Sequence, residues 1–335
     1  MDNTCSTVMS TRIRLARNLE GYPFPSHLKS DKQAKEIIRL ASSGLSRLEE
    51  FRLHYMDGIS EDEAQSLIEN HLISPALLNN RRRSAVLINH EESISVMINE
   101  EDHLREQCIV KGLDLQFAYE TMSEVDGCIS GTMKFAFDEQ LGYLTACPTN
   151  LGTGLRASVM MFLPALTING VMPRIMKSVA RLGLTVRGIY GEGSAAEGYT
   201  YQISNEVTLG VTETEILRGV EEVVLKICKL EETERERLAT GVSALDIQDE
   251  CLRSYGILLN CAKLTTEELI RLAANVKLGA ALGYIKNENV ANIDELVVKM
   301  RPSNIMEAAA KKLTPLERDV YRAQYTGKFL RKISK

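Results

Sequence analysis

Apolar residues in the first 210 positions gather in short runs, which alternate with polar turns and with longer segments of helical spacing. Residues 85–89 and 94–98 are two such runs on either side of a polar tetrapeptide, which predicts a β-hairpin. Residues 135–137 and 143–146 predict two more strands around a polar turn, and residues 185–190 predict another strand.

Helix starts are marked by side chains that can cap a first turn. The capping pairs are Ser30 with Gln33, Ser60 with Glu63, Thr212 with Glu215, and Thr265 with Glu268. The first pair predicts a helix of roughly twenty residues, and the second predicts one that ends near His71. Residues 155–166 and 173–182 predict two further helices, the latter with Pro173 in its first turn and Gly183 after its end.

Residues 213–335 have an almost entirely helical pattern. The charges of residues 231–237 predict an exposed helix end or a linker. At least three helices are expected after Gly241, and the last begins at Thr314 and ends at Gly327.

The antiparallel pairing signals favour an α+β fold over a doubly wound parallel sheet. We therefore expect an antiparallel sheet flanked by helices over residues 1–240, followed by a small all-helical domain over residues 241–335. A length of 335 residues is consistent with two domains.

Composition excludes several classes of protein. A net charge of −5 argues against non-specific nucleic-acid binding. No apolar run approaches the roughly 18 residues of a membrane span, and the first ten residues lack the apolar core of a signal peptide. The seven cysteines form no Cys-x-x-Cys pair, which argues against a zinc site and indicates a reducing cytoplasm.

Two polar runs, residues 99–105 and 147–156, each follow a short apolar stretch and each end on an arginine. The first contains three consecutive acids, and the second begins with Cys147. Carboxylates, a thiol and arginines at strand ends indicate chemistry on a cationic substrate beside a polyanionic one. Taken alone, an acidic triplet is more often a solvated turn, and a free cysteine is more often a small buried hydrophobe.

Five motifs, in order along the chain, resemble those of the ATP:guanido phosphotransferases, the phosphagen kinases. They are residues 10–18, 99–105, 147–156, 187–194 and 201–205. Within the family the chain most resembles the bacterial branch that phosphorylates arginine side chains of proteins. The resemblance implies a guanido kinase catalytic domain of the glutamine synthetase-like kind and direct in-line transfer of the γ-phosphoryl group of ATP to arginine.

This reaction makes a specific demand on proton handling. Arginine has a pKa of about 13 and glutamate one of about 4.3, so removing the proton before attack costs roughly 12 kcal/mol. Proton transfer has to be concerted with attack on a guanidinium that is held in line. The resemblance implies Glu101 as the base, Glu192 as a second clamp, Glu100 as a supporting carboxylate, and Cys147 as a non-covalent contact to the guanidinium.

A cysteine-nucleophile hydrolase is the alternative for Cys147, and it requires a histidine base such as His103. Thr149 can hydrogen-bond the thiol in either case. Gly152 and Gly154 would permit the backbone to approach a phosphate closely, although such glycines often only turn the chain.

The sequence contains no Gly-x-x-x-x-Gly-Lys-Ser/Thr loop, so arginines are the groups that it offers to ATP. The resemblance assigns His71 to the adenine, whereas the pattern alone equally fits a surface histidine. It assigns to the phosphates Arg12, Arg14, Arg105, Arg156 and Arg187. Arg12 and Arg14 alternate on an extended segment, so both should point to one face. ATP implies Mg²⁺, and because no metal-ligand cluster stands out, the nucleotide and water would hold it.

Arg318, Asp319 and Arg322 form a second candidate site on the last helix. The two arginines are four residues apart and share a face, so they suit a phosphate, while Asp319 suits a guanidinium. A salt-bridged surface helix has the same spacing. The motif resembles the phosphoarginine-reading motif of the protein-arginine kinases, which implies that bound product shifts activity or assembly.

The resemblance also implies partners and a cellular role. They are arginine-bearing protein substrates, among them a transcriptional repressor, a small zinc-binding activator protein and the Clp protease machinery, in stress response and protein quality control. We expect a cytoplasmic homodimer, with no membrane and no direct nucleic-acid partner. The apolar faces expected to support dimerisation include Leu269, Leu272, Val276, Leu278 and Leu282.

Arg12 lies close to the first residue, so we expect no N-terminal helical domain that would close over a small substrate. An open guanidine pocket suits an arginine carried by a protein. Two other functions fit the sequence: a kinase of free arginine or another small guanidine, and a phosphoarginine-binding regulatory protein with a degenerate kinase domain.

Overall fold

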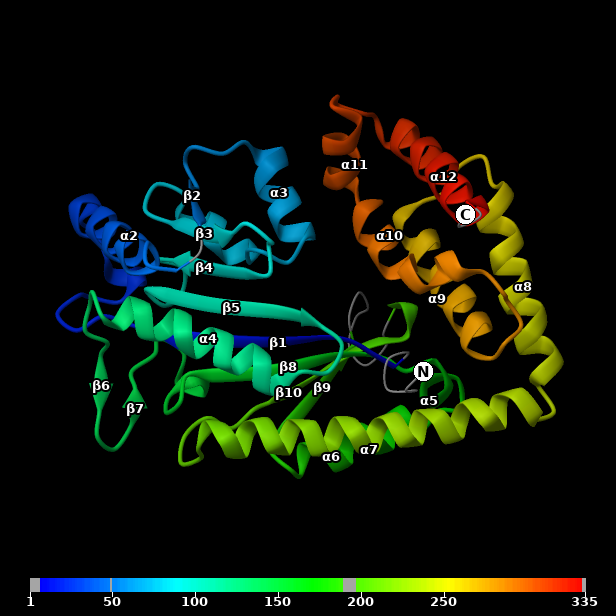
Figure 1. Cartoon of the computed structure of the whole chain (residues 1–335), viewed down its shortest axis with the longest axis horizontal. Helices are drawn as coiled ribbons and strands as arrows, with labels where there is room; N and C mark the ends of the chain where they lie inside the picture. Colours follow the sequence, from blue (N-terminus) through cyan, green and yellow to red (C-terminus); the bar gives the residue numbers. More distant parts are fainter. Residues whose placement is uncertain (1–6, 49, 189–196, 333–335) are drawn as a thin grey trace.

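The computed structural model describes residues 7–48, 50–188 and 197–332 (Figure 1). Its centre is an eight-stranded sheet of order β2-β3-β4-β5-β1-β8-β10-β9, and every neighbouring pair is antiparallel. The strands are β1 (Val8–Arg17), β2 (Phe51–Tyr55), β3 (Ala85–Asn89), β4 (Ile94–Ile98), β5 (Leu104–Lys111), β8 (Leu155–Phe162), β9 (Leu184–Gly188) and β10 (Thr200–Asn205). A separate hairpin pairs β6 (Phe137–Asp138) with β7 (Gly142–Tyr143).

Helices lie on both sides of this sheet. They are α2 (Asp31–Leu45), α3 (Glu61–Glu69), α4 (Leu115–Ser130), α5 (Pro164–Ile168), α6 (Met172–Ala180), α7 (Glu213–Thr240), α8 (Ala244–Asn260), α9 (Thr266–Ala281), α10 (Ile293–Lys299), α11 (Pro302–Ala309) and α12 (Pro315–Arg331). Figure 1 shows α6 and α7 below the strands, α4 in front of them, and α3 with the C-terminal helices above. The antiparallel sheet flanked by helices confirms the predicted α+β fold.

The two faces of the sheet differ in chemistry because side chains alternate along each strand. On β1, Ile13 and Leu15 are buried in the main apolar core, and α4 packs against this strand. Arg12 and Arg14 point to the opposite face, on the side of α3 and the C-terminal helices. At β1 the sheet is therefore apolar on one face and polar on the other, whereas at β3 and β4 the second face carries a small apolar cluster that includes Val86 and Met97.

The C-terminal helices have a core of their own. It contains Leu258 of α8, Leu269 of α9, Ile305 of α11 and Leu330 of α12, all at most 2% exposed. Phe162, the last residue of β8, belongs to the same core. The helical part is therefore packed against one end of the sheet rather than tethered at a distance from it.

Several predicted elements are confirmed. The hairpin of residues 85–89 and 94–98 is β3 with β4, and residues 184–188 form β9. Ser30, Ser60, Thr212 and Thr265 cap α2, α3, α7 and α9 by accepting hydrogen bonds from backbone N–H groups.

The helix predicted over residues 155–166 is wrong. Residues 155–162 form β8, between β1 and β10, and only residues 164–168 are helical. This strand ends on four consecutive apolar residues, 159–162, of which only Met160 is not fully buried, so the sequence hides the two-residue period that identifies a strand.

The prediction of an exposed helix end or linker at residues 231–237 holds only in part: residues 232, 233, 236 and 237 are exposed near the end of α7, whereas Glu231 and Glu234 are buried. The carboxylate of Glu231 is buried, and it accepts hydrogen bonds from the backbone N–H groups of Ala165 and Leu166 at 3.1 and 3.0 Å. Glu231 therefore caps the start of α5, and Arg235 neutralises it at 2.8 Å. Charge density alone did not distinguish this internal contact from a solvated face.

Two predictions for the helical part need correction. Gly327 does not end the last helix: α12 continues to Arg331, and a Cβ at position 327 would lie 3.0 Å from the carbonyl oxygen of Leu259. Of the five residues expected to support dimerisation, Leu269, Leu272, Val276 and Leu278 are at most 2% exposed and belong to the core of the chain itself, so they are not available for a dimer contact, whereas Leu282 is half-buried.

Candidate active site

Five arginines lie on the polar face of the sheet. The strand register places Arg156 directly opposite Arg14, and Arg12 stands one pleat further along β1. Arg105 on β5 and Arg187 on β9 are in phase with them through the intervening strands. Because residues in phase share a face, the five guanidinium groups project from one side of the sheet, as the alternation of Arg12 and Arg14 predicted.

The positive charges of these arginines repel one another, and their burial adds to the cost of keeping them charged. Burial and the charges of Arg12, Arg105 and Arg156 hold the pKa of Arg14 well below its ordinary value. Burial, followed by Arg187, lowers the pKa of Arg156. The Nε atom of Arg14 is buried without a hydrogen-bond partner among the described residues. Since arginine stays charged in proteins, the arrangement is one that a bound polyanion would relieve.

Glu100 forms an ion pair with Arg105 of this arginine cluster. Nη1 of Arg105 donates to both of its carboxylate oxygens at 2.8 and 2.9 Å, and the Ser74 hydroxyl donates to Oε1. The Glu100 side chain is only 1% exposed. Its carboxylate therefore positions Arg105 and is poorly placed to accept a proton from a substrate.

Glu101, by contrast, is exposed at a cavity of about 280 Å³ that Arg14, Arg105 and Cys147 also line. Partial burial, the neighbouring Asp102 and then Glu100 raise the pKa of Glu101, and Arg105 opposes them. A carboxylate with a raised pKa is a stronger base. Of the two adjacent glutamates, Glu100 therefore positions Arg105, and Glu101 faces the cavity.

Asp102 joins three segments of the site. Its Oδ1 accepts a hydrogen bond from Asn18 Nδ2 at 2.5 Å and another from the backbone N–H of Ala146 at 2.7 Å. The Oδ1 of Asn18 in turn accepts a hydrogen bond from the backbone N–H of His103, the next residue, at 2.9 Å. Asp102 is 3% exposed, so its carboxylate is an internal group and not part of a solvated turn. It connects the end of β1 and the Glu101 turn to the residue before Cys147.

His103 does not contact Cys147. Its Nδ1 accepts from the N–H of Leu19 at 3.1 Å, and its Nε2 lies 2.9 Å from the carbonyl oxygen of Pro23. Burial lowers its pKa to about 4, so the ring is neutral near pH 7. With both ring nitrogens bonded to backbone, His103 is not available as the base that a cysteine hydrolase requires.

Cys147, which directly precedes Pro148, has an extended backbone with φ −95° and ψ 120°. Its thiol is half-buried, lines the cavity beside Glu101 and lies 3.1 Å from Thr149 Oγ1. Thr145 Oγ1 donates to the carbonyl oxygen of Cys147 at 2.8 Å. Two threonines thus fix the thiol and its backbone at the edge of the cavity.

The glycines after Cys147 are required by the chain itself. Gly152 has φ +102°, and a Cβ there would lie 2.1 Å from the carbonyl oxygen of Thr208. Gly154 has φ +64°, and a Cβ there would lie 2.6 Å from the carbonyl oxygen of Ala16. The close approach that these glycines permit is therefore to neighbouring backbone. This packing fixes the loop that carries Cys147.

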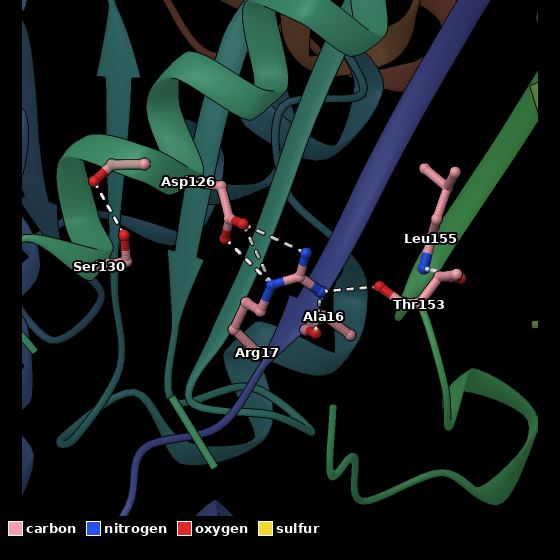
Figure 2. Close-up of polar contacts among 7 residues, drawn as sticks. Ala16, Arg17, Asp126, Ser130, Thr153 and Leu155 are labelled. Carbon is pink, nitrogen blue, oxygen red and sulfur yellow. Dashed lines mark hydrogen bonds and ion pairs between the residues drawn. The ribbon is translucent and has the colours of Figure 1, made fainter. Parts of the chain in front are cut away.

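Arg17 reinforces the same loop from the opposite face of the sheet. Figure 2 shows its guanidinium between Asp126, at 3.1 Å, and the carbonyl oxygen of Thr153, at 3.0 Å. Its Cζ lies 3.6 Å from the centroid of the Tyr143 ring. Its position on β1 is out of phase with Arg12 and Arg14, a signal in the sequence that separates this structural arginine from the phosphate candidates.

His71 follows α3 and lies at the far end of the arginine row. Burial, then Arg301 and Arg12, lower its pKa to about 4, so its ring is neutral near pH 7. His71 lines a cavity of about 330 Å³ together with Arg12 and Arg187. That cavity shares Arg187 and Gln202 with the one around Glu101, so the two adjoin along the sheet.

The structure brings together Glu101, Cys147 and the arginines, but Glu192 lies outside the described residues. Asp102 and Asn18 are the site residues that sequence reasoning missed. Both lie inside recognised motifs, and the carboxylate of Asp102 was hidden by two neighbouring acids of the same type.

The second candidate site is partly buried. Arg322 is 1% exposed, and it donates to the carbonyl oxygens of Met300 and Leu264 at 2.8 and 2.6 Å and to Asp319 Oδ1 at 2.7 Å. Arg318 is half-buried on the same helix face, close enough for its charge to lower the pKa of Arg322, after the larger effect of burial. Arg322 thus fixes Asp319, while Arg318 remains partly open to solvent.

No group of three or more His, Cys, Asp or Glu side chains in residues 7–48, 50–188 and 197–332 is arranged to hold a metal ion. No helix in the same part of the chain combines the length and the apolar character that crossing a bilayer requires.

The sequence matches two described families. Residues 33–234 match the family described as "ATP:guanido phosphotransferase, C-terminal catalytic domain", and residues 244–335 match "Protein-arginine kinase McsB C-terminal domain". The protein-arginine kinase of Halothermothrix orenii is 44% identical over 320 residues, which are 95% of this chain and 91% of that protein. The protein-arginine kinase of Caldanaerobacter subterraneus is 42% identical and is covered over 97% of both lengths.

Solved structures agree with the sequence matches. The substrate-free duplicated taurocyamine kinase from Schistosoma mansoni superimposes with a TM-score of 0.63 at 26% identity, over 81% of this chain. The chain spans only 40% of that duplicated protein. Lombricine kinase superimposes with a TM-score of 0.60 at 28% identity, over 69% of this chain and 67% of its own.

Proposed function

We propose protein-arginine kinase activity for this chain, which belongs to the ATP:guanido phosphotransferase family. The observation that carries the proposal is the order of groups along one face of the sheet. Glu101 and Cys147 lie at one end, the arginines lie in the middle, and His71 lies at the other end. This order suits a guanidinium, a triphosphate and a nucleoside placed in line.

The arginine cluster fits the polyphosphate of ATP. Arg14 is buried with an unpartnered Nε, and among the described residues Glu100 is the carboxylate that pairs with the cluster. In our proposal the arginines bind the phosphates and stabilise charge on the oxygens of the transferring group. Mg²⁺ bound to the nucleotide would add positive charge between the phosphates, and its remaining ligands would be water.

Glu101 is the proposed general base. It accepts a proton from a guanidinium nitrogen as that nitrogen attacks the γ-phosphorus, so a nitrogen–phosphorus bond forms while the bond to the ADP oxygen breaks. Cys147 contacts the guanidinium and orients it, without a covalent intermediate. Glu192 is proposed as the second clamp. Asp102 holds the Glu101 turn and the Cys147 loop at a fixed separation.

Support for a protein-borne acceptor comes from the C-terminal half of the chain. Residues 244–335 match the domain of protein-arginine kinases, and relatives of that name are 42–44% identical over nearly the whole chain. We further propose that Arg318, Asp319 and Arg322 bind phosphoarginine, with Arg318 contacting the phosphate and the Arg322–Asp319 pair facing the guanidinium. The division of the chain near residue 240 remains part of this proposal.

The family resemblance supports a wider role. We propose a cytoplasmic homodimer that acts in the stress response with a zinc-binding activator protein and the Clp protease machinery. Because four of the five residues expected at the dimer contact are buried, we propose that the contact lies elsewhere. Leu245 and Leu252 of α8, 74% and 43% exposed, are available for it.

The proposed roles separate in one experiment. Glu101→Gln removes the base but leaves the arginines, so it should abolish labelling of casein by γ-labelled ATP and retain ATP binding. Arg14→Gln should lose ATP binding. If Glu101→Gln phosphorylates casein at the wild-type rate, Glu101 is not the base.

A further inference from the structure

A cavity of about 350 Å³, called the aromatic cavity below, lies where the chain continues beyond the end of β1. One wall is formed by residues 18–22 and Phe24. The other wall is formed by residues 135–137 and Leu144, at the base of the β6–β7 hairpin. Figure 1 shows this hairpin at the end of the sheet opposite to the C-terminal helices. The aromatic cavity is therefore remote from the helical part of the chain.

The aromatic cavity adjoins the Glu101 end of the candidate active site. Asn18, on its wall, donates from Nδ2 to Asp102 Oδ1 at 2.5 Å and to the carbonyl oxygen of Leu144 at 3.0 Å. Asp102 in turn lines the cavity that Glu101 and Cys147 share. One hydrogen-bonded pair, Asn18 with Asp102, thus joins the walls of the two cavities.

The direction of the arginine row determines where the main chain of an acceptor arginine lies. Arg14 and Ala16 follow one another on the polar face of β1 and line the Glu101 cavity, and Asn18, two residues further on, lines the aromatic cavity. In-line transfer places the acceptor guanidinium beyond the γ-phosphate, at the Glu101 end of the row. The aliphatic stem and main chain of the acceptor therefore leave on the side away from the phosphates, towards the aromatic cavity.

The lining of this cavity is mostly apolar. Phe24 and Phe137 are 37% and 58% exposed, and Leu19 and Phe135 also line the cavity. Among the described residues on its walls, Glu20 is the one charged side chain. Exposed aromatic rings around a hollow are typical of a binding surface. The volume is at the small end of the roughly 300–1,000 Å³ of ligand pockets, which suits a single large side chain.

Backbone hydrogen bonds fix the two walls relative to each other. The N–H of Ala136 donates to the carbonyl oxygen of Asn18 at 2.7 Å, and the N–H of Leu144 donates to the carbonyl oxygen of Ala136 at 2.9 Å. The ring of Phe137 packs edge-to-face on that of Tyr143, with centroids 5.3 Å apart. The cavity is thus preformed, so little ordering of the chain is required when a side chain enters it.

We propose that the aromatic cavity binds a large apolar side chain within two residues of the acceptor arginine, in an extended segment of the protein substrate. Phe24 and Phe137 make the contact, and the kinase then prefers arginines that have an apolar neighbour. This inference rests on the proposed function, because it takes an arginine in a protein as the acceptor. It adds a determinant of which arginines are phosphorylated.

The test compares peptides that differ only beside the arginine. The parent carries one arginine among glycines and serines, and four derivatives each place one phenylalanine at one of the two positions before or after it. Phe24→Ser and Phe137→Ser remove the two exposed rings separately. Phe117→Ser is the matched control, because Phe117 is 56% exposed on α4 and does not line the cavity. The full chain with saturating ATP and Mg²⁺ would give kcat/KM for each peptide.

Burying a phenylalanine side chain contributes about 1.5–3 kcal/mol. At least one derivative should therefore exceed the parent in kcat/KM by roughly tenfold or more in wild type. Phe24→Ser and Phe137→Ser should each lower this ratio towards one, and Phe117→Ser should keep it. The ratio is internally controlled, because a loss of folded enzyme reduces the rate on both peptides equally.

A ratio near one for every derivative in wild type would overturn the inference and leave the proposed function standing. A high ratio that both cavity variants retain, or that Phe117→Ser lowers as much, would overturn it too, because the preference would then arise elsewhere on the surface. If wild type phosphorylates neither casein nor any peptide, the proposed function is lost together with this inference.

Discussion

Replacing Asp102 should lower both the free energy of unfolding and kcat without changing the affinity for ATP. The Asp102→Ala variant removes the acceptor for Asn18 Nδ2 and for the N–H of Ala146, at 2.5 and 2.7 Å. A hydrogen bond to a charged acceptor contributes about 1.5–3 kcal/mol. Asn18 retains the carbonyl oxygen of Leu144 as a second acceptor, at 3.0 Å, so one of the two losses is partly compensated.

The pKa of Asp102 sets the sign of the opposing effect. Burial raises this pKa above its ordinary value, although the Ala146 and Asn18 hydrogen bonds oppose it. A raised pKa means that the ionised form is less favourable in the folded chain, so removing the charge recovers part of the loss. We therefore expect Asp102→Ala to lower the free energy of unfolding by about 2–3 kcal/mol. Asp102→Asn, whose amide oxygen can accept both bonds, should stay close to wild type.

Denaturant unfolding and protein phosphorylation would be measured on both variants. Loss of the Ala146 contact frees the residue before Cys147, and a displacement of about 1 Å at a reacting group can cost roughly 10²-fold in rate. The Ala variant should therefore lose kcat while its ATP affinity stays the same. Equal stability and equal kcat in all three proteins would refute the positioning role of Asp102. A change confined to ATP affinity would refute it as well.

Three further predictions follow from individual contacts. Glu231→Ala should lower the free energy of unfolding by roughly 3 kcal/mol in denaturant titrations, because it leaves two backbone N–H groups of α5 and Arg235 without their carboxylate. The control is Glu236→Ala, at an exposed position of the same helix, which should leave the free energy of unfolding unchanged. Equal losses in the two variants would contradict the capping role of Glu231. Gly152→Ala should lower the melting temperature far more than Gly21→Ala, since both have positive φ but only Gly152 meets another atom, at 2.1 Å; similar losses would show that the loop can move away. His71 and His103 have folded pKa values of about 4, below the unfolded value, so the unfolded chain binds more protons and stability should fall as pH drops from about 6.5 to 4, by up to roughly 3 kcal/mol per histidine. His103→Gln should show a shallower pH dependence of denaturant stability, and an unchanged slope would contradict this account.

Local chemistry in the sequence identified much of the fold. Capping pairs identified the starts of α2, α3, α7 and α9, because a Ser or Thr side chain before a helix accepts a hydrogen bond from an otherwise unpaired N–H group of the first turn. The pattern failed for β8, where four consecutive apolar residues at its end, 159–162, remove the alternation from the sequence. It failed again at Gly327, because only the close approach of α8 explains a glycine inside α12.

The candidate site was likewise predictable from the sequence only in part. Residue types and strand alternation place the arginines on one face, and motif order places Glu101 with Cys147. Which of two adjacent glutamates faces the cavity depends on Ser74 and Arg105, which come from other elements. Such partners carry no signal in the local pattern.

The most direct test of the central claim is the distribution of label from γ-labelled ATP between casein and free arginine offered together with Mg²⁺. The account predicts label on the protein that is lost in mild acid, as nitrogen–phosphorus bonds are, and that is absent with Glu101→Gln. Label found only on free arginine would contradict it. So would label on casein that survives acid.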